Sequence, residues 1–323
     1  MASSKKLKPK KPTKRIGIAL SGGLDSVVLL DAVSKAYPHD TLFALHIHHG
    51  LQKQADEWLI FCEQLAHRYQ IGFDFRLLYL HDQTGNVEAR ARTARYDALI
   101  DLCEVHDLDH LLLAHHQNDQ AETILLQLLR GAGPSGLSGM GGRKELRSAS
   151  GKQITLWRPL LEQNRAELEA YAKRQSLQWV EDPSNQNPRF RRNAVRKTIL
   201  PALSKIQPGA IANLARSAQL LAQAQTLLDR LAHEDAKTVL QNGVLLIAPL
   251  ITLQAKDQAS ANNVLRYWLK NHQLTMPSQE RLQAWWQDLA GTRSDKRLQW
   301  MHDGRTIRAW RGLLHIDPQP SQE

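Results

Sequence analysis

A regular alternation of short apolar runs and helical patterns, starting at residue 16, most constrains how this 323-residue chain can fold. Five apolar runs are typical of buried or half-buried strands, at residues 16–20, 41–47, 73–80, 110–115 and 153–157. Five helical patterns lie between or after them, at residues 25–37, 55–70, 87–106, 118–130 and 164–178. This alternation favours right-handed crossovers and parallel strands. The sequence therefore predicts an α/β domain with a doubly wound, mostly parallel sheet, which binds ligands beyond the carboxyl ends of its strands.

The pattern changes after Pro208 and predicts a second, smaller α+β domain. Its expected elements are a long helix, a short strand, two helices and a hairpin with an Asp303-Gly304 turn, at residues 210–240, 243–248, 257–271, 277–290 and 297–316. Five of the eight tryptophans lie here, at positions 268, 285, 286, 300 and 310. They either fill a small core or stack RNA bases beside nearby arginines. We expect a disordered basic tail at 1–15, a first domain at 16–207 and a second domain at 208–323.

The net charge of +10 is concentrated in two segments. Residues 1–15 carry seven positive charges and no acid, and a second basic run contains Arg189, Arg191, Arg192, Arg196 and Lys197. Such clusters suit a polyanionic partner, and we expect the four arginines of the second run to contact RNA phosphates. A solvated charged helix face is the alternative.

Several classes of protein are excluded by what the sequence lacks. No run of 18 apolar residues is present, which argues against a membrane span, and no apolar segment follows the basic N-terminus as in a signal peptide. Two cysteines, Cys62 and Cys103, cannot form a disulfide framework or a four-ligand zinc site. We therefore expect a cytoplasmic protein without membrane contact.

A glycine-containing loop follows the first predicted strand and opens the first predicted helix. It comprises Ser21, Gly22, Gly23, Leu24, Asp25 and Ser26. Glycine lets the backbone approach an anion, and amides at a helix N-terminus point towards phosphate oxygens. The serines add hydroxyl donors, and Asp25 can bind Mg²⁺. The loop lacks the Gly-Lys-Ser/Thr and G-x-G-x-x-G patterns of other phosphate loops, and an ordinary capped glycine turn is the alternative.

A second polar segment begins at the carboxyl end of a predicted strand and runs into a helix, from His115 to Thr123. Asp119 and Glu122 are three residues apart and share one helix face. Two carboxylates so placed can hold an ammonium group, which favours an amino-acid amine or a lysine side chain as ligand. Capping of the helix by Asn118 or Asp119 is the structural alternative, and both roles are compatible.

An arginine pair on the helix at 87–106 adds a further candidate for phosphate binding. Arg92 and Arg95 are three residues apart, so they can share a helix face and bind a phosphate. A solvated face on which Glu88 pairs with Arg92 is the alternative. The histidines at 46, 48 and 49 also suggest zinc, but alternate residues of a strand point to opposite faces, and the cysteines lie elsewhere.

The ordered motifs between residues 16 and 205 carry a family resemblance. The loop SGGLDS resembles the pyrophosphatase loop of N-type ATP pyrophosphatases. Later segments resemble the tRNA(Ile)-lysidine synthetase family, namely HIHHGLQKQADEW, EARARTARY, HHQNDQAET, WRPL, EDPSN and RRNAVR. Two positions depart from the family pattern, because His48 stands where the family commonly has Asn and Asn118 where it often has Asp.

The resemblance implies an ATP-dependent ligase with three substrates. ATP adenylates O2 of the wobble cytidine in the CAU-anticodon tRNA(Ile), releasing pyrophosphate, and the ε-amine of L-lysine then attacks C2 and expels AMP. It implies that Asp119 and Glu122 bind lysine, that His115 lies beside the reacting centre and that Arg95 and Asp25 act on ATP with Mg²⁺. His115 and Asp119 are the candidates for the general base. It also suggests a homodimer, and it implies that residues 16–207 form the ATP-pyrophosphatase catalytic domain and residues 208–323 the tRNA-contacting domain.

Two rival functions stay open at this stage. The nearer is a tRNA thiolase of the same superfamily, but sulfur transfer usually needs paired cysteines, and Cys62 and Cys103 are far apart in sequence. The other is a non-catalytic RNA-binding protein with an inherited nucleotide fold. Retention of the SGGLDS loop, Asp119 and Glu122 argues against the second.

Overall fold

The computed structural model describes residues 14–38, 41–48, 54–78, 87–183, 191–291 and 298–317. The chain forms two compact units, Met1–Leu221 and Ala222–Glu323, and the division falls within one long helix, α9 (Ala210–Val239). The expected boundary at residue 208 lies just before that helix and stays a prediction. The expected tail lies outside the described residues except for Lys14 and Arg15.

The first unit contains a six-stranded sheet in the order β3-β2-β1-β4-β6-β5. Its strands are β1 (Arg15–Ala19), β2 (Thr41–His48), β3 (Gly72–Leu77), β4 (His110–Leu112), β5 (Arg143–Arg147) and β6 (Gln153–Trp157). Every neighbouring pair is parallel except β5 with β6. The predicted doubly wound, mostly parallel sheet is therefore confirmed.

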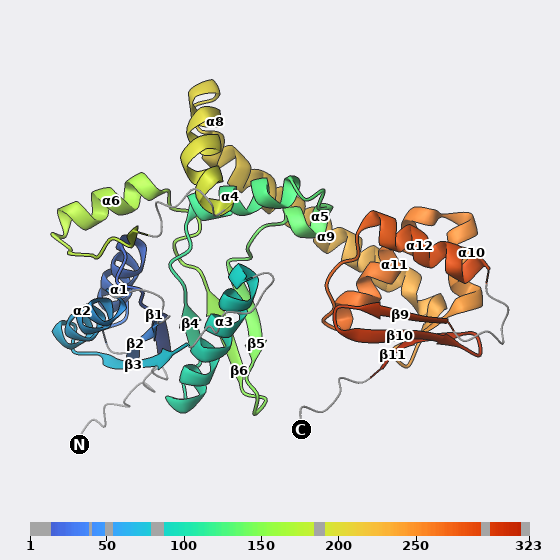
Figure 1. The fold of residues 1–323 in the computed structure, drawn as a ribbon, viewed down its shortest axis with the longest axis horizontal. Helices are drawn as coiled ribbons and strands as arrows, with labels where there is room; N and C mark the ends of the chain where they lie inside the picture. The colour runs from blue at the N-terminus through green and yellow to red at the C-terminus, as the bar shows by residue number, and fades with distance from the viewer. Residues whose placement is uncertain are drawn as a thin grey trace, which may run out of the picture. The chain divides into compact units, whose positions relative to one another are not determined.

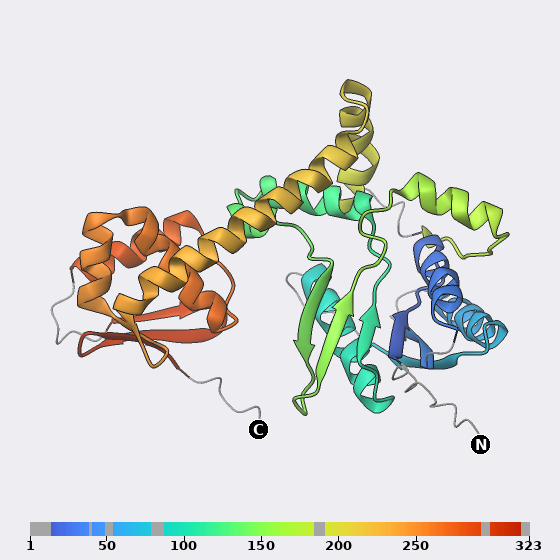
Figure 2. The same cartoon turned by 180° about the vertical axis from the view of Figure 1, so that it is seen from behind.

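Helices cover both faces of this sheet (Figures 1 and 2). The helices that cover it are α1 (Leu24–Ala36), α2 (Ala55–Arg68), α3 (Val87–Val105) and α6 (Arg165–Arg174). The remaining elements, α4 (Gln117–Leu128), α5 (Pro134–Leu137), α7 (Arg191–Ala194), a π-helical turn η2 (Val195–Ile199) and α8 (Leu200–Ile206), follow in the chain, and α4, η2 and α8 share a small apolar cluster of their own. One apolar core joins the sheet to α1, α2 and α6 through residues such as Ile18, Leu65 and Leu168. A second joins the opposite face to α3 through Leu102 and Leu111.

The strand order determines where the polar loops meet. β1 lies between β2 and β4, and the strand order reverses direction at this point. β2 and β3 lie on one side of β1, and β4, β6 and β5 lie on the other. The loop at residues 20–23 follows β1, and residues 113–116 follow β4. Because β1 and β4 are parallel neighbours, both segments leave the same edge of the sheet, at the switch point where such folds bind ligands.

The second unit is the predicted α+β fold, with a five-stranded antiparallel sheet in the order β7-β8-β11-β10-β9. Its strands are β7 (Leu240–Gln241), β8 (Val244–Leu246), β9 (Leu298–His302), β10 (Arg305–Trp310) and β11 (Leu313–Ile316). The helices α10 (Ile247–Lys256), α11 (Gln258–Asn271) and α12 (Gln279–Ala290) pack with part of α9 around one core.

Several predicted element boundaries were wrong. The expected hairpin at 297–316 consists of three strands, with left-handed turn residues at Asp303-Gly304 and again at Arg311-Gly312. The strand expected at 243–248 ends at Leu246, and the unpredicted helix α10 follows directly. Strand β5 was also missed, because an edge strand of sequence RKELR has no apolar alternation.

The tryptophans of the second unit separate into two groups. Four are buried, and the indole N–H groups of Trp268, Trp286 and Trp300 donate to Gly243 O, Asn262 Oδ1 and Asp288 Oδ2. These side chains fill the core, and their polar N–H groups are satisfied there. Trp310 is 42% exposed, with the guanidinium of Arg311 at 4.4 Å from its ring centroid. Trp310 alone among the five can therefore offer much ring surface to a partner.

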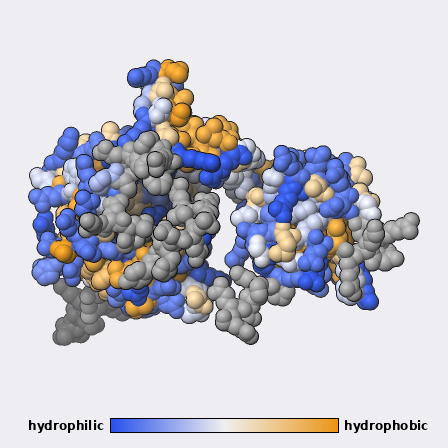
Figure 3. Space-filling model, in the orientation of Figure 1, coloured by the Kyte–Doolittle hydropathy of each residue, from blue (hydrophilic) through white to orange (hydrophobic). Residues whose placement is uncertain are grey.

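The surface of the first unit carries exposed apolar side chains around α8 and the end of α4 (Figure 3). They include Leu128, Leu129, Ile199 and Ile206. Within the described part of the chain, no helix has the length and apolar character needed to cross a bilayer.

Candidate active site

The loop after β1 is closed by its own serine hydroxyls. Ser26 Oγ donates to Gly23 O at 2.9 Å and accepts from the backbone N–H of Ser21 at 3.2 Å. The two serine Oγ atoms lie 3.1 Å apart. α1 begins at Leu24 directly after Gly23, so its first amides face the end of the sheet where the loop lies. The predicted strand, loop and helix are thus present in the order that phosphate binding requires.

Gly22 holds the loop against a segment from much later in the chain. Its φ angle is +82°, and its carbonyl accepts from the backbone N–H of Val180 at 3.0 Å. A Cβ atom at this position would lie 2.9 Å from Val180 Cγ2 and 3.2 Å from Cys62 Sγ. Both the backbone conformation and the surrounding space therefore require glycine.

Asp25 lies where the loop meets α4 and α6. Its Oδ2 is 3.4 Å from Arg165 Nη1 and 3.5 Å from His116 Nε2. Its Oδ1 is buried and has no hydrogen-bond partner among the described residues. A buried carboxylate oxygen without a partner beside a phosphate loop fits one ligand position of a magnesium ion that also binds nucleotide phosphates.

The start of α4 brings His116 and Asp119 together. His116 is the N-cap residue, and its backbone N–H donates to Asp119 Oδ2 at 3.0 Å. Its ring is almost fully buried, with Nε2 at 3.5 Å from oxygens of both Asp25 and Asp119. His116 thus lies between the phosphate loop and the predicted ammonium site. The expected N-capping by Asn118 or Asp119 was wrong, because the helix begins earlier and His116 is its N-cap; Asp119 is instead the third residue of the helix, and its carboxylate accepts from the N-cap backbone.

The two predicted lysine-binding carboxylates face two of the predicted RNA-binding arginines. Arg192 Nε donates to Glu122 Oε2 and Arg196 Nε to Glu122 Oε1, each at 2.6 Å. The Nη2 atoms of Arg192 and Arg196 lie 3.0 and 3.3 Å from Asp119 Oδ1. Burial alone would raise the pKa of Asp119, but the neighbouring His116 and Arg192 hold that pKa below its usual value. Two acids and two bases therefore form one compact, charge-balanced cluster.

His115 points towards a different arginine. Its Nδ1 accepts from Arg158 Nε at 3.3 Å, and Arg158 Nη1 donates to Gly141 O at 2.7 Å. Burial is the main cause that lowers the pKa of His115 to about 3; attraction to Asp119 opposes it, and repulsion from Arg158 and Arg192 adds to it. The imidazole is therefore neutral at physiological pH, and its Nε2 carries the proton.

Arg95 lies on α3, the helix that also carries Arg92. Arg95 keeps an exposed surface, yet surrounding protein atoms and repulsion from Arg92 and Arg192 lower its pKa. The guanidinium of Arg92 lies 5.7 Å from the centroid of the Tyr96 ring. The side chain of Glu88 lies outside the described residues, so its expected pairing with Arg92 stays a prediction.

The remaining predicted RNA contacts are only partly described. Arg191 is exposed, and Arg189 lies outside the described residues. Sequence reasoning missed His116, Arg158 and Arg165 as members of the site. For Arg158 and His116 the available signal was their position within the motifs WRPL and HHQNDQAET. No local signal exists for Arg165, because its approach to Asp25 joins residues 140 positions apart.

The histidines of β2 form two separate contacts. His46 Nδ1 lies 2.8 Å from Leu20 O, and His48 Nε2 lies 2.9 Å from Asp56 Oδ1. Over the described ranges, no group of three or more His, Cys, Asp or Glu side chains is arranged to hold a metal ion. Cys62 and Cys103 are buried in different cores, and burial raises the pKa of each thiol to about 12. Neither thiol is suited to sulfur transfer at neutral pH.

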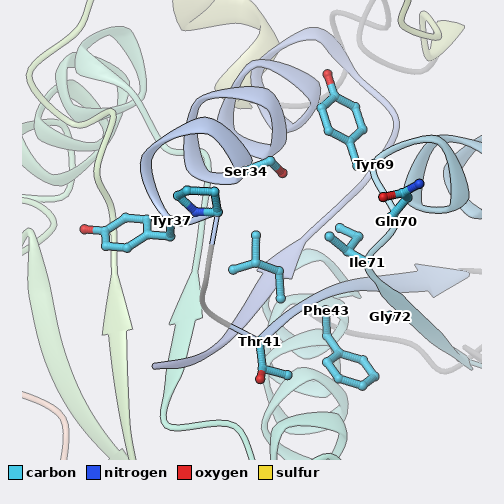
Figure 4. A pocket seen from close by; sticks show the side chains of 10 residues that line it. Ser34, Tyr37, Thr41, Phe43, Tyr69, Gln70, Ile71 and Gly72 are labelled. Carbon is cyan, nitrogen blue, oxygen red and sulfur yellow. The ribbon is translucent and has the colours of Figure 1, made fainter. Parts of the chain in front are cut away.

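A cleft of about 360 Å³ lies at the opposite end of the sheet. It is lined by the end of α1, the start of β2 and the segment between α2 and β3, including Tyr37, Phe43 and Tyr69 (Figure 4). This is the amino-terminal end of the strands, away from the loop and the charged cluster.

Comparisons with known proteins match both units of the chain. A family profile described as PP-loop domain matches residues 2–203, and one described as TilS substrate binding domain matches residues 249–315. The tRNA(Ile)-lysidine synthase of Pectobacterium atrosepticum is 40% identical over 306 residues, which cover 93% of this chain and 67% of that protein. The synthase of Burkholderia pseudomallei is 41% identical over 297 residues, which cover 92% and 60%.

A solved structure supports the fold only. A U34-tRNA thiolase from Methanococcus maripaludis aligns with a TM-score of 0.55 and 19% identity, covering 66% of this chain and 74% of that one. Because the relatives that match over most of this chain are tRNA(Ile)-lysidine synthases, the thiolase alternative is not favoured. The expected enzyme class, an ATP-dependent ligase, agrees with these relatives. On the matches to both domain profiles and to these relatives, the chain belongs to the tRNA(Ile)-lysidine synthase family.

Proposed function

We propose that this chain joins L-lysine to C2 of the wobble cytidine in CAU-anticodon tRNA(Ile), converting ATP to AMP and pyrophosphate. The observation that carries the proposal is the convergence of the phosphate loop with the Asp119–Glu122 pair, with His116 Nε2 at 3.5 Å from both Asp25 and Asp119. ATP and lysine sites that meet at one sheet edge would place an adenylated base within reach of an amine.

The first step forms a bond between cytosine O2 and the α phosphorus of ATP and breaks the α–β phosphoanhydride. The loop amides and the N-terminus of α1 would hold the phosphates, and the guanidinium of Arg95 would stabilise charge on the α phosphate. Asp25 would hold Mg²⁺, which neutralises phosphate charge when bound. A carbonyl oxygen is a poor leaving group, and adenylation makes it a good one.

In the second step, the lysine amine attacks C2 and AMP departs with the cytosine O2. Asp119 and Glu122 would bind the ammonium and orient it before it loses a proton. The tautomer of His115, with Nδ1 accepting from Arg158, leaves an Nε2–H that suits donation to the reacting oxygen. His115 in this form donates, so Asp119 would be the remaining candidate for the acceptor of the amine proton, and loss of its contact with Arg192 would make it a stronger base.

The tRNA would be held by the second unit together with the basic run at 189–197. The profile that describes a substrate-binding domain supports this assignment, as do the exposed Trp310 and Arg311. The relatives are longer than this chain, which spans 60 to 69% of their length.

The direct test is incubation of the purified protein with total tRNA, ATP and labelled lysine, followed by nucleoside analysis. Lysidine should form only in CAU-anticodon tRNA(Ile), with AMP release that depends on both tRNA and lysine. Asp25→Asn should abolish AMP release without changing the circular dichroism spectrum. A modified nucleoside containing sulfur, or no lysine incorporation, would contradict the proposal.

We also propose that the protein acts in the cytoplasm as a homodimer. The exposed apolar residues around α8 and the end of α4 support a docking face for a second copy. Size-exclusion chromatography with light scattering measures the mass directly. A monomeric mass at all micromolar protein concentrations would contradict the dimer.

A further inference from the structure

Four side chains that were expected to bind two different substrates bind each other in this structure. Asp119 and Glu122 suit an ammonium ion, and Arg192 and Arg196 suit phosphate groups. Each arginine instead contacts both carboxylates, with N–O distances from 2.6 to 3.3 Å. These contacts join α4 to the α7–η2 segment. The groups expected to bind the ammonium and the phosphate are therefore already paired with each other.

The carboxylate oxygens have little capacity left for a lysine ammonium. Glu122 is 0% exposed, and both of its oxygens accept from a guanidinium. Asp119 Oδ1 accepts from Arg192 and Arg196, and its Oδ2 accepts from the His116 backbone. An added ammonium would also leave one net positive charge in a largely buried cluster, which is unfavourable at low dielectric.

The arginines are the more exposed members of the cluster. The side chains of Arg192 and Arg196 keep 25% and 33% of their surface exposed, in contrast to Glu122. Arg196 lies in η2, a π-helical turn that interrupts the α-helical hydrogen bonding and often marks functional positions. The guanidinium groups, unlike Glu122, are therefore open to contact with a phosphate from solvent.

We propose that Arg192 and Arg196 act as a lock on the lysine site that a phosphate group opens. When a phosphate of tRNA or of ATP draws one guanidinium away, both carboxylates gain acceptor positions, because each arginine contacts both, and the remaining three side chains carry one net negative charge. Lysine then binds, so the lock orders the substrates, with the phosphate-bearing substrate first and the amine second. This proposal rests on the proposed function, because it assigns lysine to Asp119 and Glu122.

Equilibrium dialysis with labelled L-lysine tests the lock. Lysine should bind the full-length wild-type protein weakly when alone. Its affinity should rise by about tenfold or more with the ligand that opens the lock, as expected if the open form is a tenth or less of the molecules. One arm adds tRNA(Ile) transcript and another adds an ATP analogue with a methylene between the α and β phosphorus atoms. A rise in either arm supports the lock and identifies the source of the phosphate, whereas no rise in both overturns it.

Variants separate a lock from a simple structural role. Arg192→Gln and Arg196→Gln should each bind lysine more tightly than wild type without any phosphate ligand, and should lose most of the response to it. A structural role alone predicts weaker lysine binding, and that result would overturn the proposal. Lys205→Gln removes one exposed positive charge from α8 and should match wild type. If the arginine variants fail to fold, the wild-type arms still decide.

The two proposals fail in different ways. If lysidine forms in tRNA but the affinity for lysine does not depend on phosphate ligands, the lock proposal is wrong and the proposed function stands. Lysine binding that responds to tRNA without lysidine formation would support the lock and contradict the assigned reaction.

Discussion

At the scale of single residues, Arg158 determines which form of His115 the site contains. The guanidinium donates to Nδ1 and repels a proton there, and the surrounding protein atoms disfavour a charged ring. A histidine in this form donates from Nε2 at any pH near neutrality. Arg158 was quoted as part of a motif but was assigned no role, because only tertiary packing brings it to a residue 43 positions earlier.

Arg158→Met should raise the pKa of His115 from about 3, while burial keeps it below the value of a free imidazole. The pH dependence of the His115 Cε1–H resonance in NMR measures the change, with assignment by the His115→Gln variant. Arg158→Lys keeps the positive charge and should give a smaller shift. An unchanged midpoint in Arg158→Met would show that burial alone sets this pKa.

Gly22→Ala tests the requirement for glycine in the phosphate loop. The substitution forces a β carbon into the left-handed region and against Val180, so we expect a loss of about 1–3 kcal/mol of stability. Urea denaturation measures that loss, and ATP affinity should fall with it. Gly151→Ala, at φ +90° with nothing within 4 Å of the new Cβ, is the matched control for conformational strain alone. Equal losses of stability would show that the contact with Val180 contributes little.

At the scale of elements, one buried carboxylate joins three helices of the first unit. Asp31 on α1 accepts from Tyr69 Oη at 2.8 Å, from Tyr171 Oη at 2.7 Å and from Lys35 Nζ at 2.8 Å. Tyr69 follows α2 and Tyr171 belongs to α6, so these contacts fix the helices that support the phosphate loop. Burial would raise the pKa of Asp31, but the three donors together lower it.

Asp31→Asn should destabilise the first unit by about 2 kcal/mol, because hydrogen bonds to a charged acceptor are lost or weakened. Since the folded-state pKa lies below the unfolded value of 3.8, the wild-type contribution is present above about pH 4 and is lost as pH falls through the folded-state value. Urea denaturation at pH 7 and near pH 3 should show that the difference between the proteins shrinks in acid. Tyr171→Phe, which removes one donor, should cost less. A difference that does not depend on pH would contradict the role of the Asp31 charge.

The elements also show what the sequence predicts well and what it does not. The central strands and the loop at 21–26 were predictable because apolar runs and glycine turns are local signals. Helix α10 was not, because the apolar stretch from Val244 to Leu253 shows no decisive period, and Pro249 falls in the first turn, where a helix tolerates it. The residue types of the site were predicted, but the pairing of Glu122 with Arg192 and Arg196 joins residues at least 70 positions apart and depends on packing.

At the scale of the whole molecule, the two units have separate cores, and the basic tail precedes the first strand. The backbone of Lys14 accepts from Thr41 N–H at 2.9 Å, and Arg15 begins β1. The remaining tail, residues 1–13, carries five lysines and no acid. Its charge can add to tRNA affinity without taking part in the chemistry.

Deleting residues 1–13 should weaken tRNA binding by less than about tenfold and make it less dependent on salt, because fewer counterions are released on binding. Filter binding at several salt concentrations measures both effects. The maximal rate of AMP release at saturating tRNA should match that of the full chain. A folded truncation with no activity would contradict the assignment of the tail to binding alone.

The hydrogen bond between Gly22 and Val180 has a consequence for how the protein is made. During synthesis the loop that contains Gly22 leaves the ribosome before its partner segment, which emerges more than 150 residues later. The charge of Glu122 is likewise not balanced by its arginine partners until Arg192 and Arg196 have been synthesised. A nascent chain that ends before residue 180 therefore has the central strands of the sheet but no finished site. Completion of the site is thus a late event in the cotranslational folding of the first unit.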